Sequence, residues 1–231
     1  HRRSGARRLR PAQDLRVSAM AEHSSNEAFS TLERMVRGMR IAMKPGKLLY
    51  SSRDSLKRGD LYVLGFNPGG DPNVERENVL EDLLRTPSSQ WNEYINGSWR
   101  LRSKTYLAGQ QPRQLRIRSF FSEIDCNLSK IFCSNLFFFR SKSISSAMLD
   151  HNFETLARES AHIHTYMLST VKPKTIICFG SSTYNWFKRL RLHETPYPVQ
   201  LIQAPHFAAR ISEKAFLTRA REINNSICNN G

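Results

Sequence analysis

The sequence has little cysteine and no long apolar run. Its four cysteines include no C-x-x-C pair, so we expect no metal site and the reduced thiols of a cytoplasmic protein. No apolar run approaches the roughly 18 residues that a membrane helix needs, so we expect no membrane span. Six arginines lie within the first 16 residues, but no apolar segment follows them, which argues against a secretory signal.

Acidic residues are also scarce relative to basic ones. The chain holds 20 Asp and Glu against 35 Lys and Arg, and its formal net charge is +15 at pH 7. A charge of this size and sign favours a polyanion, so we expect a nucleic acid as the partner. General surface basicity is the alternative that composition leaves open.

The length of 231 residues predicts one domain with an insertion. Residues 1–19 precede Met20 and are either a disordered basic arm that touches DNA or a leader foreign to the natural protein. Residues 20–231 are expected to form a single domain, and we expect a monomer. Inside it, residues 86–118 mix aromatic and basic side chains with no clear period. This is typical either of a surface that binds nucleic acid or of a solvated loop whose aromatic rings are fixed to the core.

Four short apolar runs predict β-strands, and segments with helical periodicity separate them. The strand runs cover residues 61–64, 130–136, 174–179 and 199–203. Helices are expected over residues 26–43, with Ser24 or Ser25 as the cap, over 74–84, 120–128 and 149–171, and after Gly180 and Ser212. Strands that alternate with helices indicate a parallel sheet covered on both faces. We therefore predict an α/β fold, a three-layer αβα sandwich around a central four-stranded parallel sheet.

The first strand ends in a loop of small residues and prolines, Gly65-Phe66-Asn67-Pro68-Gly69-Gly70. Asn67 is one of the few side chains in this loop that can form hydrogen bonds, and it precedes a proline that restricts its backbone to extended conformations. In an open α/β sheet, ligands bind beyond the carboxyl ends of the strands. The sequence therefore predicts a functional amide at this position.

Polar and cationic side chains also follow the second and fourth strands. The second strand ends at Asn135 and leads to Arg140 and Lys142, and the fourth leads to His206 and Arg210. Neighbouring parallel strands place their carboxyl ends along one edge of the sheet. We therefore expect these side chains and Asn67 to form one site.

The third strand turns through Gly180 directly into a helix that begins at Ser181 and Ser182. The first turn of a helix presents free backbone N–H groups, so a DNA phosphate could dock there. Ordinary N-capping by serine is the alternative.

The motifs after the first and fourth strands resemble those of a known family. Gly65-Phe66-Asn67-Pro68-Gly69 is similar to the G-x-N-P-G motif of the uracil-DNA glycosylase superfamily, in its mismatch-specific thymine/uracil branch and the related single-strand-selective branch. The segment from Ala204 to Arg210 resembles the second motif of that branch, in which an arginine follows a proline by five positions. The resemblance covers about residues 57–225 and leaves the insertion unmatched.

This resemblance implies a monofunctional DNA glycosylase that flips a pyrimidine out of DNA and hydrolyses its N-glycosidic bond to leave an abasic site. Asn67 would position the attacking water, Asn135 would read the flipped base, and Arg210 would fill the hole left in the duplex. Gly65, the backbone and ring of Phe66, Pro68, Gly69 and Gly70 would border the base. Arg140, Lys142 and the segment Gly180-Ser181-Ser182 would contact DNA.

The sequence departs from the family pattern at His206, where the second motif usually has serine. His206 could contact a phosphate or the leaving base. Together with the insertion, it favours an enlarged pyrimidine, such as the hydroxymethylated or glucosylated cytosines of some bacteriophages, and hence a role in antiviral defence. The cysteine cluster of the iron-sulfur branches is missing, so no cofactor is expected.

Two alternatives remain open. One is repair of uracil or of mismatched thymine by the same chemistry. The other is a DNA-binding module on the same fold that breaks no bond. A dinucleotide-binding enzyme is disfavoured because no G-x-G-x-x-G turn follows the first strand.

Overall fold

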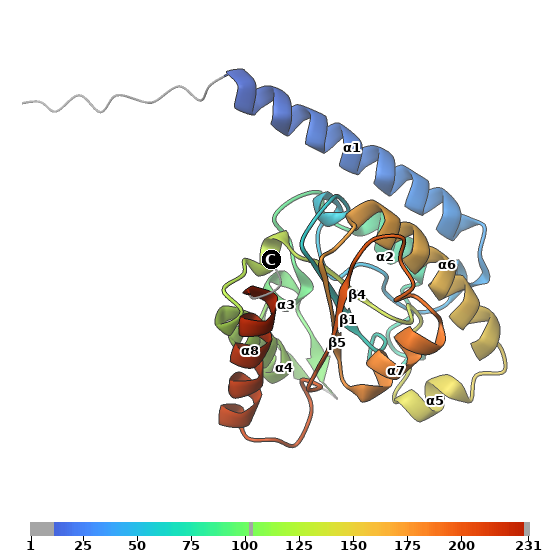
Figure 1. Ribbon diagram of the computed structural model, residues 1–231. Helices are drawn as coiled ribbons and strands as arrows, with labels where there is room; N and C mark the ends of the chain where they lie inside the picture. The colour runs from blue at the N-terminus through green and yellow to red at the C-terminus, as the bar shows by residue number, and fades with distance from the viewer. Residues whose placement is uncertain (1–11, 102–103, 229–231) are drawn as a thin grey trace, which may run out of the picture.

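A central sheet of four parallel strands organises the protein (Figure 1). The computed structural model describes residues 12–101 and 104–228, with side chains described for residues 25–100 and 104–228. The strands are β1 (Leu61–Gly65), β4 (Phe132–Asn135), β5 (Thr175–Phe179) and β6 (Gln200–Ala204), in the spatial order β4-β1-β5-β6. Every pairing is parallel, which confirms the predicted sheet. A separate hairpin joins β2 (Arg100–Leu101) to β3 (Lys104–Thr105).

Helices cover both faces of the sheet, which confirms the predicted three layers (Figure 1). One face carries α3 (Glu93–Asn96), α4 (Pro112–Glu123) and α8 (Glu213–Cys228). The other carries α1 (Ala12–Arg37), α2 (Val79–Arg85), α5 (Ile144–Met148), α6 (Phe153–Val171) and α7 (Ser181–Arg189).

Alternating strand residues build two separate apolar cores. Tyr62 and Leu64 enter the first core, under α1, α2, α6 and α7, whereas Val63 enters the second core, under α3, α4 and α8. This alternation follows from the pleat, which sends successive side chains to opposite faces. The parity of each strand therefore decides on which face a side chain at its carboxyl end emerges.

The first helix is longer than predicted at its start and shorter at its end. It begins at Ala12 and ends at Arg37, and a 3₁₀ turn over Arg40–Met43 follows it. Ser24 and Ser25 therefore lie inside α1 and do not cap it. No proline or glycine interrupts residues 12–24, so nothing local stops the helix there. Residues 12–19 of the expected arm are part of α1, and residues 1–11 lie outside the described residues.

The segment 86–118 has more regular structure than its sequence indicates. It contains α3, the β2-β3 hairpin and the first half of α4, so the helix predicted over residues 120–128 actually begins at Pro112. Gln111 caps α4 with a capping box, a role that the sequence pattern did not single out. Tyr94 is buried in the second core and Trp99 packs against it, as in the alternative with rings fixed to the core.

Candidate active site

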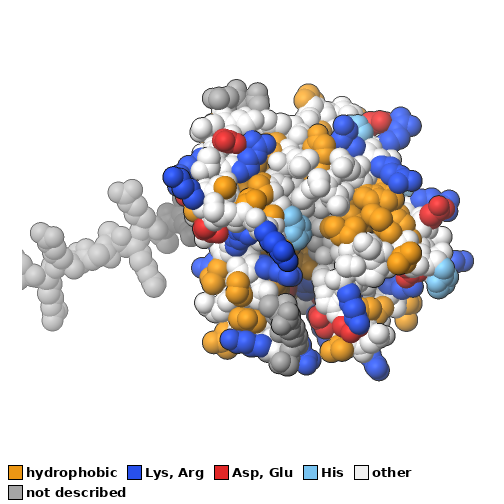
Figure 2. Space-filling model, turned by 90° about the horizontal axis from the view of Figure 1, so that it is seen from below, with side chains coloured by type: hydrophobic (Ala, Val, Ile, Leu, Met, Phe, Trp, Pro, Cys, Tyr) orange, Lys and Arg blue, Asp and Glu red, His pale blue; other side chains and the backbone are white. Residues whose placement is uncertain are grey.

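The loops that follow β1, β4, β5 and β6 meet at one end of the sheet, at the bottom of Figure 1. Figure 2 looks onto this end and shows more basic than acidic side chains around it. This is the edge where the sequence predicted a site. β5 lies between β1 and β6, so Gly180 separates the loop that bears Asn67 from the loop that bears His206.

The side chain of Asn67 is held by hydrogen bonds that all come from its amide nitrogen. Its Nδ2 donates to Ser141 Oγ at 2.8 Å, to the Pro68 carbonyl at 3.1 Å and to the Phe139 carbonyl at 3.4 Å. Carbonyl oxygens only accept, so these neighbours fix the orientation of the amide. Its Oδ1 makes no hydrogen bond to a described residue, and the side chain is partly exposed. The result is a fixed acceptor that a water molecule can reach.

The backbone after β4 pairs with residues 65–75, which are the end of β1 and the loop that follows it and are called the motif loop below, and extends the sheet beyond the strand ends. The N–H groups of Leu136 and Phe137 donate to the carbonyls of Gly65 and Phe66, both at 2.9 Å. The Ser141 N–H donates to the Pro68 carbonyl at 3.3 Å. The loop after β1 and the segment after β4 therefore hold each other in place, and the backbone of Asn67 is fixed with them.

Arg140 and Lys142 bind acidic residues of the motif loop. Arg140, whose side chain is 15% exposed, pairs with Glu75 at 2.9 Å and donates to the Gly69 carbonyl. Lys142 pairs with Asp71 at 2.8 Å, and this hydrogen bond lowers the pKa of the Asp71 carboxyl. Both cations support the loop in this structure, and only Lys142 is well exposed, at 64% of its side chain.

Asn135 and Gly65 are partners on neighbouring strands. A methyl group at Gly65 would collide with Asn135 Oδ1, so the glycine makes room for this amide. Asn135 is only 4% exposed, yet its Nδ2 has no hydrogen-bond partner among the described residues. An unpaired buried donor costs about 1–3 kcal/mol, and such groups concentrate at functional positions. Asn135 thus offers a buried amide donor in need of an acceptor.

Tyr50, which no sequence motif singled out, lies beside Asn135. Burial raises the pKa of Tyr50 to about 12, although the charge of Arg140 and the contact with the Asn135 side chain lower it, so the phenol is neutral at pH 7. That contact lacks the geometry of a hydrogen bond, so Asn135 Nδ2 stays unpaired among the described residues. Tyr50 belongs to a segment that bridges to the outer edge of β4. Its short apolar run, Leu48-Leu49-Tyr50, was the available signal.

The ring of Phe66 does not border the face that carries Asn135. It packs in the first core against Phe137, with ring centroids 5.0 Å apart, whereas the strand residue two places before Gly65, Val63, enters the second core. The ring points this way because Phe66 follows Gly65 by one position and the pleat reverses the direction of successive side chains. Pro68 is buried, and Gly69 and Gly70 are exposed beside it. Gly70 has a φ of 105°, which favours glycine.

His206 packs against Gly180 as a neutral ring. A methyl group at Gly180, whose φ is 88°, would lie 3.2 Å from His206 Cβ. The Ala208 N–H donates to His206 Nδ1 at 3.1 Å, which assigns the proton to Nε2. Burial, assisted by the charge of Arg113, lowers the pKa of His206. The ring is therefore a neutral donor at pH 7.

The start of α7 lies beside His206. Gly180 is the N-cap residue, and no side chain caps the helix, so serine capping is not what the structure shows. Ser181 and Ser182 form the first turn, whose N–H groups carry the positive end of the helix dipole. Arg210 is exposed on the neighbouring loop and makes no hydrogen bond or ion pair to a described residue.

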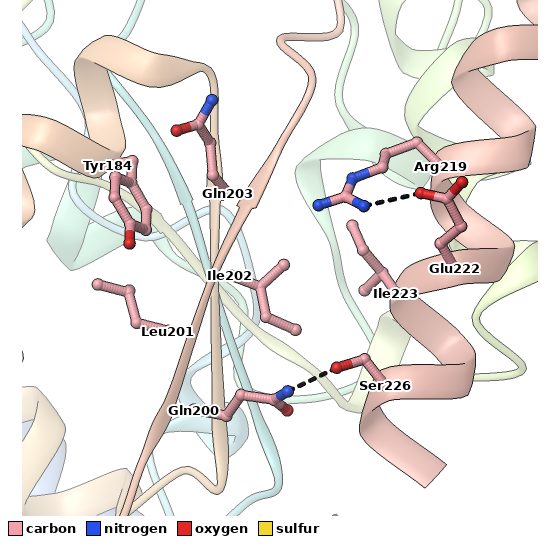
Figure 3. A pocket seen from close by; sticks show the side chains of 9 residues that line it. All are labelled: Tyr184, Gln200, Leu201, Ile202, Gln203, Arg219, Glu222, Ile223 and Ser226. Atoms are coloured by element: carbon pink, nitrogen blue, oxygen red, sulfur yellow. Dashed lines mark hydrogen bonds and ion pairs between the residues drawn. The ribbon is translucent and has the colours of Figure 1, made fainter. Parts of the chain in front are cut away.

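A hollow of about 400 Å³ lies apart from these residues, between β6, α7 and α8 (Figure 3). Its polar side chains bind one another: Gln200 donates to Ser226 at 2.7 Å, and Arg219 pairs with Glu222 at 2.7 Å. It contains none of the predicted site residues.

Among the described residues, no group of three or more His, Cys, Asp or Glu could hold a metal ion, and no helix is long and apolar enough to cross a bilayer. The four cysteines, all within the described part of the chain, are free. Neither a protein-family model nor a curated protein matches the chain. Function therefore has to be inferred from the side chains at the strand ends.

Proposed function

We propose that the protein is a monofunctional DNA glycosylase with a fold like that of the uracil-DNA glycosylase superfamily. The observation that carries this proposal is the pair of amides at neighbouring strand ends. Asn67 presents a fixed, free acceptor, and Asn135 presents a buried, unpaired donor. The free acceptor of Asn67 would bind the attacking water, and the unpaired donor of Asn135 would bind an acceptor atom of the base.

Asn67 would hold the attacking water through Oδ1. Its three hydrogen bonds from Nδ2 prevent the amide from turning, so the geometry exists before the substrate arrives. Glycosidic bond fragmentation that is largely dissociative needs little activation of the nucleophile. Orientation of water by a neutral amide is then enough, provided that the leaving base is stabilised.

Asn135 would donate from Nδ2 to a carbonyl oxygen or a ring nitrogen of the flipped pyrimidine. The bond would satisfy a donor that is otherwise buried without a partner. Gly65 supports this role because it leaves space for the amide over the strand end. The neutral phenol of Tyr50 would border the same edge of the base.

His206 would stabilise the departing base. Its neutral Nε2–H can donate to an oxygen on which negative charge develops, and the amino terminus of α7 adds positive potential at the same place. Alternatively, the N–H groups of Ser181 and Ser182 would bind a DNA phosphate. Arg210, exposed and unpaired among the described residues, would enter the duplex.

The substrate that we propose is an enlarged pyrimidine, such as a hydroxymethylated or glucosylated phage cytosine, in a role of antiviral defence. His206 in place of the usual serine and the added segment 86–118 are the features that favour it. Repair of uracil or mismatched thymine would use the same residues. The net charge of +15 also suits a DNA-binding module that breaks no bond.

Strand scission by alkali tests this proposal. Labelled duplexes would carry uracil, a G·T mismatch, hydroxymethylcytosine or its glucosylated form, and labelled single strands would carry the same bases without the mismatch. Alkali-labile product from one substrate, absent before alkali, would support a monofunctional glycosylase and identify its base. Salt-sensitive binding without product on any of them would favour the binding module.

A further inference from the structure

Arg116 of α4 organises the loop that bears His206 and Arg210. Its Nη1 donates to the carbonyls of Phe207 at 3.1 Å and Ala209 at 2.8 Å, and its Nη2 donates to the Ile211 carbonyl at 2.9 Å. One guanidinium from a distant part of the sequence thus binds three carbonyls of a single loop.

The rest of the Arg116 side chain is fixed as well. The guanidinium lies over the ring of Phe216, 4.3 Å from its centroid, and Nε is 3.4 Å from the Glu213 carboxylate. Only 16% of the side chain is exposed. Nε makes no hydrogen bond to a described residue and has only the charge of Glu213 beside it. A planar group held on its face by the ring and at both Nη atoms by carbonyls still has one orientation, so it can act as a template for the loop.

The bonded carbonyls alternate along the loop and bracket Arg210. The carbonyls of Ala209 and Ile211 both turn inward to Arg116, and Arg210 lies between them with its side chain exposed. On the other side, the Ala209 N–H donates to the His206 carbonyl at 2.8 Å. The backbone is thereby fixed before and after the residue that would enter DNA.

We propose that Arg116 is a positioning residue, which preorganises the loop over residues 206–211 so that Arg210 projects from it in a defined direction. The role in base release rests on the proposed glycosylase function, whereas the ordering of the loop does not. Lysine could not replace the arginine, because an ammonium lacks the planar fork and cannot reach three carbonyls with fixed geometry.

The test variant is Arg116→Met, which keeps an apolar stem over Phe216 and removes the fork. Arg118→Met is the matched control, because Arg118 is an exposed arginine of the same helix whose one hydrogen bond to a described residue, at 3.5 Å, goes to Gly109. Arg116→Lys is a second variant that retains the charge, in case the methionine variant does not fold.

Hydrogen exchange of the free protein tests the ordering without any substrate. In Arg116→Met and Arg116→Lys, the amides of Ala208 and Ala209 should exchange about tenfold faster or more, the equivalent of about 1.4 kcal/mol. Arg118→Met should leave them unchanged. Unchanged exchange in both Arg116 variants, with the fold intact, would overturn the proposal.

Coupling to Arg210 tests the positioning role. Arg116→Met should slow single-turnover base release about tenfold in the wild-type background and less than about twofold in an Arg210→Ala background. An equal loss in both backgrounds would overturn the positioning role and leave Arg116 as a merely structural residue. If the wild type releases no base at all, the glycosylase function fails, while the exchange measurement still decides on the loop.

Discussion

Asn67 Nδ2 and Ser141 Oγ are joined by a hydrogen bond of 2.8 Å that links the loop after β1 to the loop after β4. The Ser141 hydroxyl gives its own proton to the Ser143 carbonyl, also at 2.8 Å. Ser141 Oγ is therefore free to accept from Asn67. This chain of donors fixes which end of the Asn67 amide remains available to a ligand.

Ser141→Ala should lower the rate of base release without weakening DNA binding. One of the three bonds that orient Asn67 is lost, which corresponds to about 0.5–1.5 kcal/mol and a rate between about twofold and tenfold lower. Single-turnover kinetics and a binding titration separate the two effects. Ser145→Ala, which changes an exposed serine of the following helix, is the control, and a variant of Ser141 with the wild-type rate would contradict the orienting role.

Gly65→Ala should displace the Asn135 amide while the protein remains folded. The new methyl group meets the far end of the Asn135 side chain, which can rotate, so the damage should be local. We expect base release to fall about tenfold or more, since the reading bond is worth at least one buried hydrogen bond. Gly59→Ala is the matched control, because Gly59 lies before β1 and its added methyl group would meet its neighbours only at ordinary contact distances of 3.7 Å or more. Equal activity of the two variants would remove Asn135 from the site.

His164 should make the protein less stable in acid. It is fully buried, accepts from the Tyr62 hydroxyl at Nδ1, and shares its Nε2–H between the Asn135 and Leu136 carbonyls. Burial lowers its pKa from 6.5 to about 4, although the two carbonyls oppose the shift. Because the folded state resists protonation, the stabilisation is present above pH 6.5 and is lost as the pH falls towards 4.

The loss attributable to His164 should be about 3 kcal/mol of unfolding free energy over that interval, from about 1.4 kcal/mol per pKa unit. Denaturant unfolding from pH 7 to pH 4 measures it. His164→Gln should flatten the decline relative to the wild type. His151→Gln, which changes a histidine whose side chain is 88% exposed, should not. Parallel pH curves for the His164 variant and the wild type would disprove the assignment.

Lys47→Met should destabilise the protein strongly. Lys47 pairs with Asp82 at 2.6 Å and with Glu93 at 3.2 Å, and all three side chains are at most 16% exposed. Burial alone would lower the pKa of Lys47, but the two carboxylates outweigh it and raise the pKa. Removal of the Lys47 ammonium leaves two buried carboxylates without a counter-charge, which should lower the free energy of unfolding by about 3–5 kcal/mol. Thermal unfolding of the variant beside Lys174→Met, which removes an exposed pair, checks this prediction; equal stability would contradict it.

The four strands could be predicted because short apolar runs are local signals, and glycines end two of these runs, at Gly65 and Gly180. The positions of Asn67 and His206, which follow strand ends, and of Asn135, which is the last residue of β4, could be predicted for the same reason. The helix starts at Ala12 and Pro112 could not be predicted as easily, since polar helices lack an apolar period and the cap of α4 is a glutamine.

Contacts between residues that are far apart in the sequence could not be predicted, for a different reason. Arg116 binds a loop about 90 positions later, and Tyr50 reaches Asn135 across the edge of β4. Such contacts depend on which helices and segments pack together. The direction of the Phe66 ring depended on strand parity, which is readable once the strand register is known.

The most direct measurement of the central claim is single-turnover base release by Asn67→Ala, on whichever substrate the wild type cleaves best. Asn73→Ala is the matched control, because it removes an exposed asparagine amide from the same loop. If Asn67 Oδ1 positions the attacking water, its loss should slow release about a hundredfold or more, with DNA affinity nearly unchanged and the control at the wild-type rate. A rate for Asn67→Ala equal to that of Asn73→Ala would contradict the assignment of the active site to this loop.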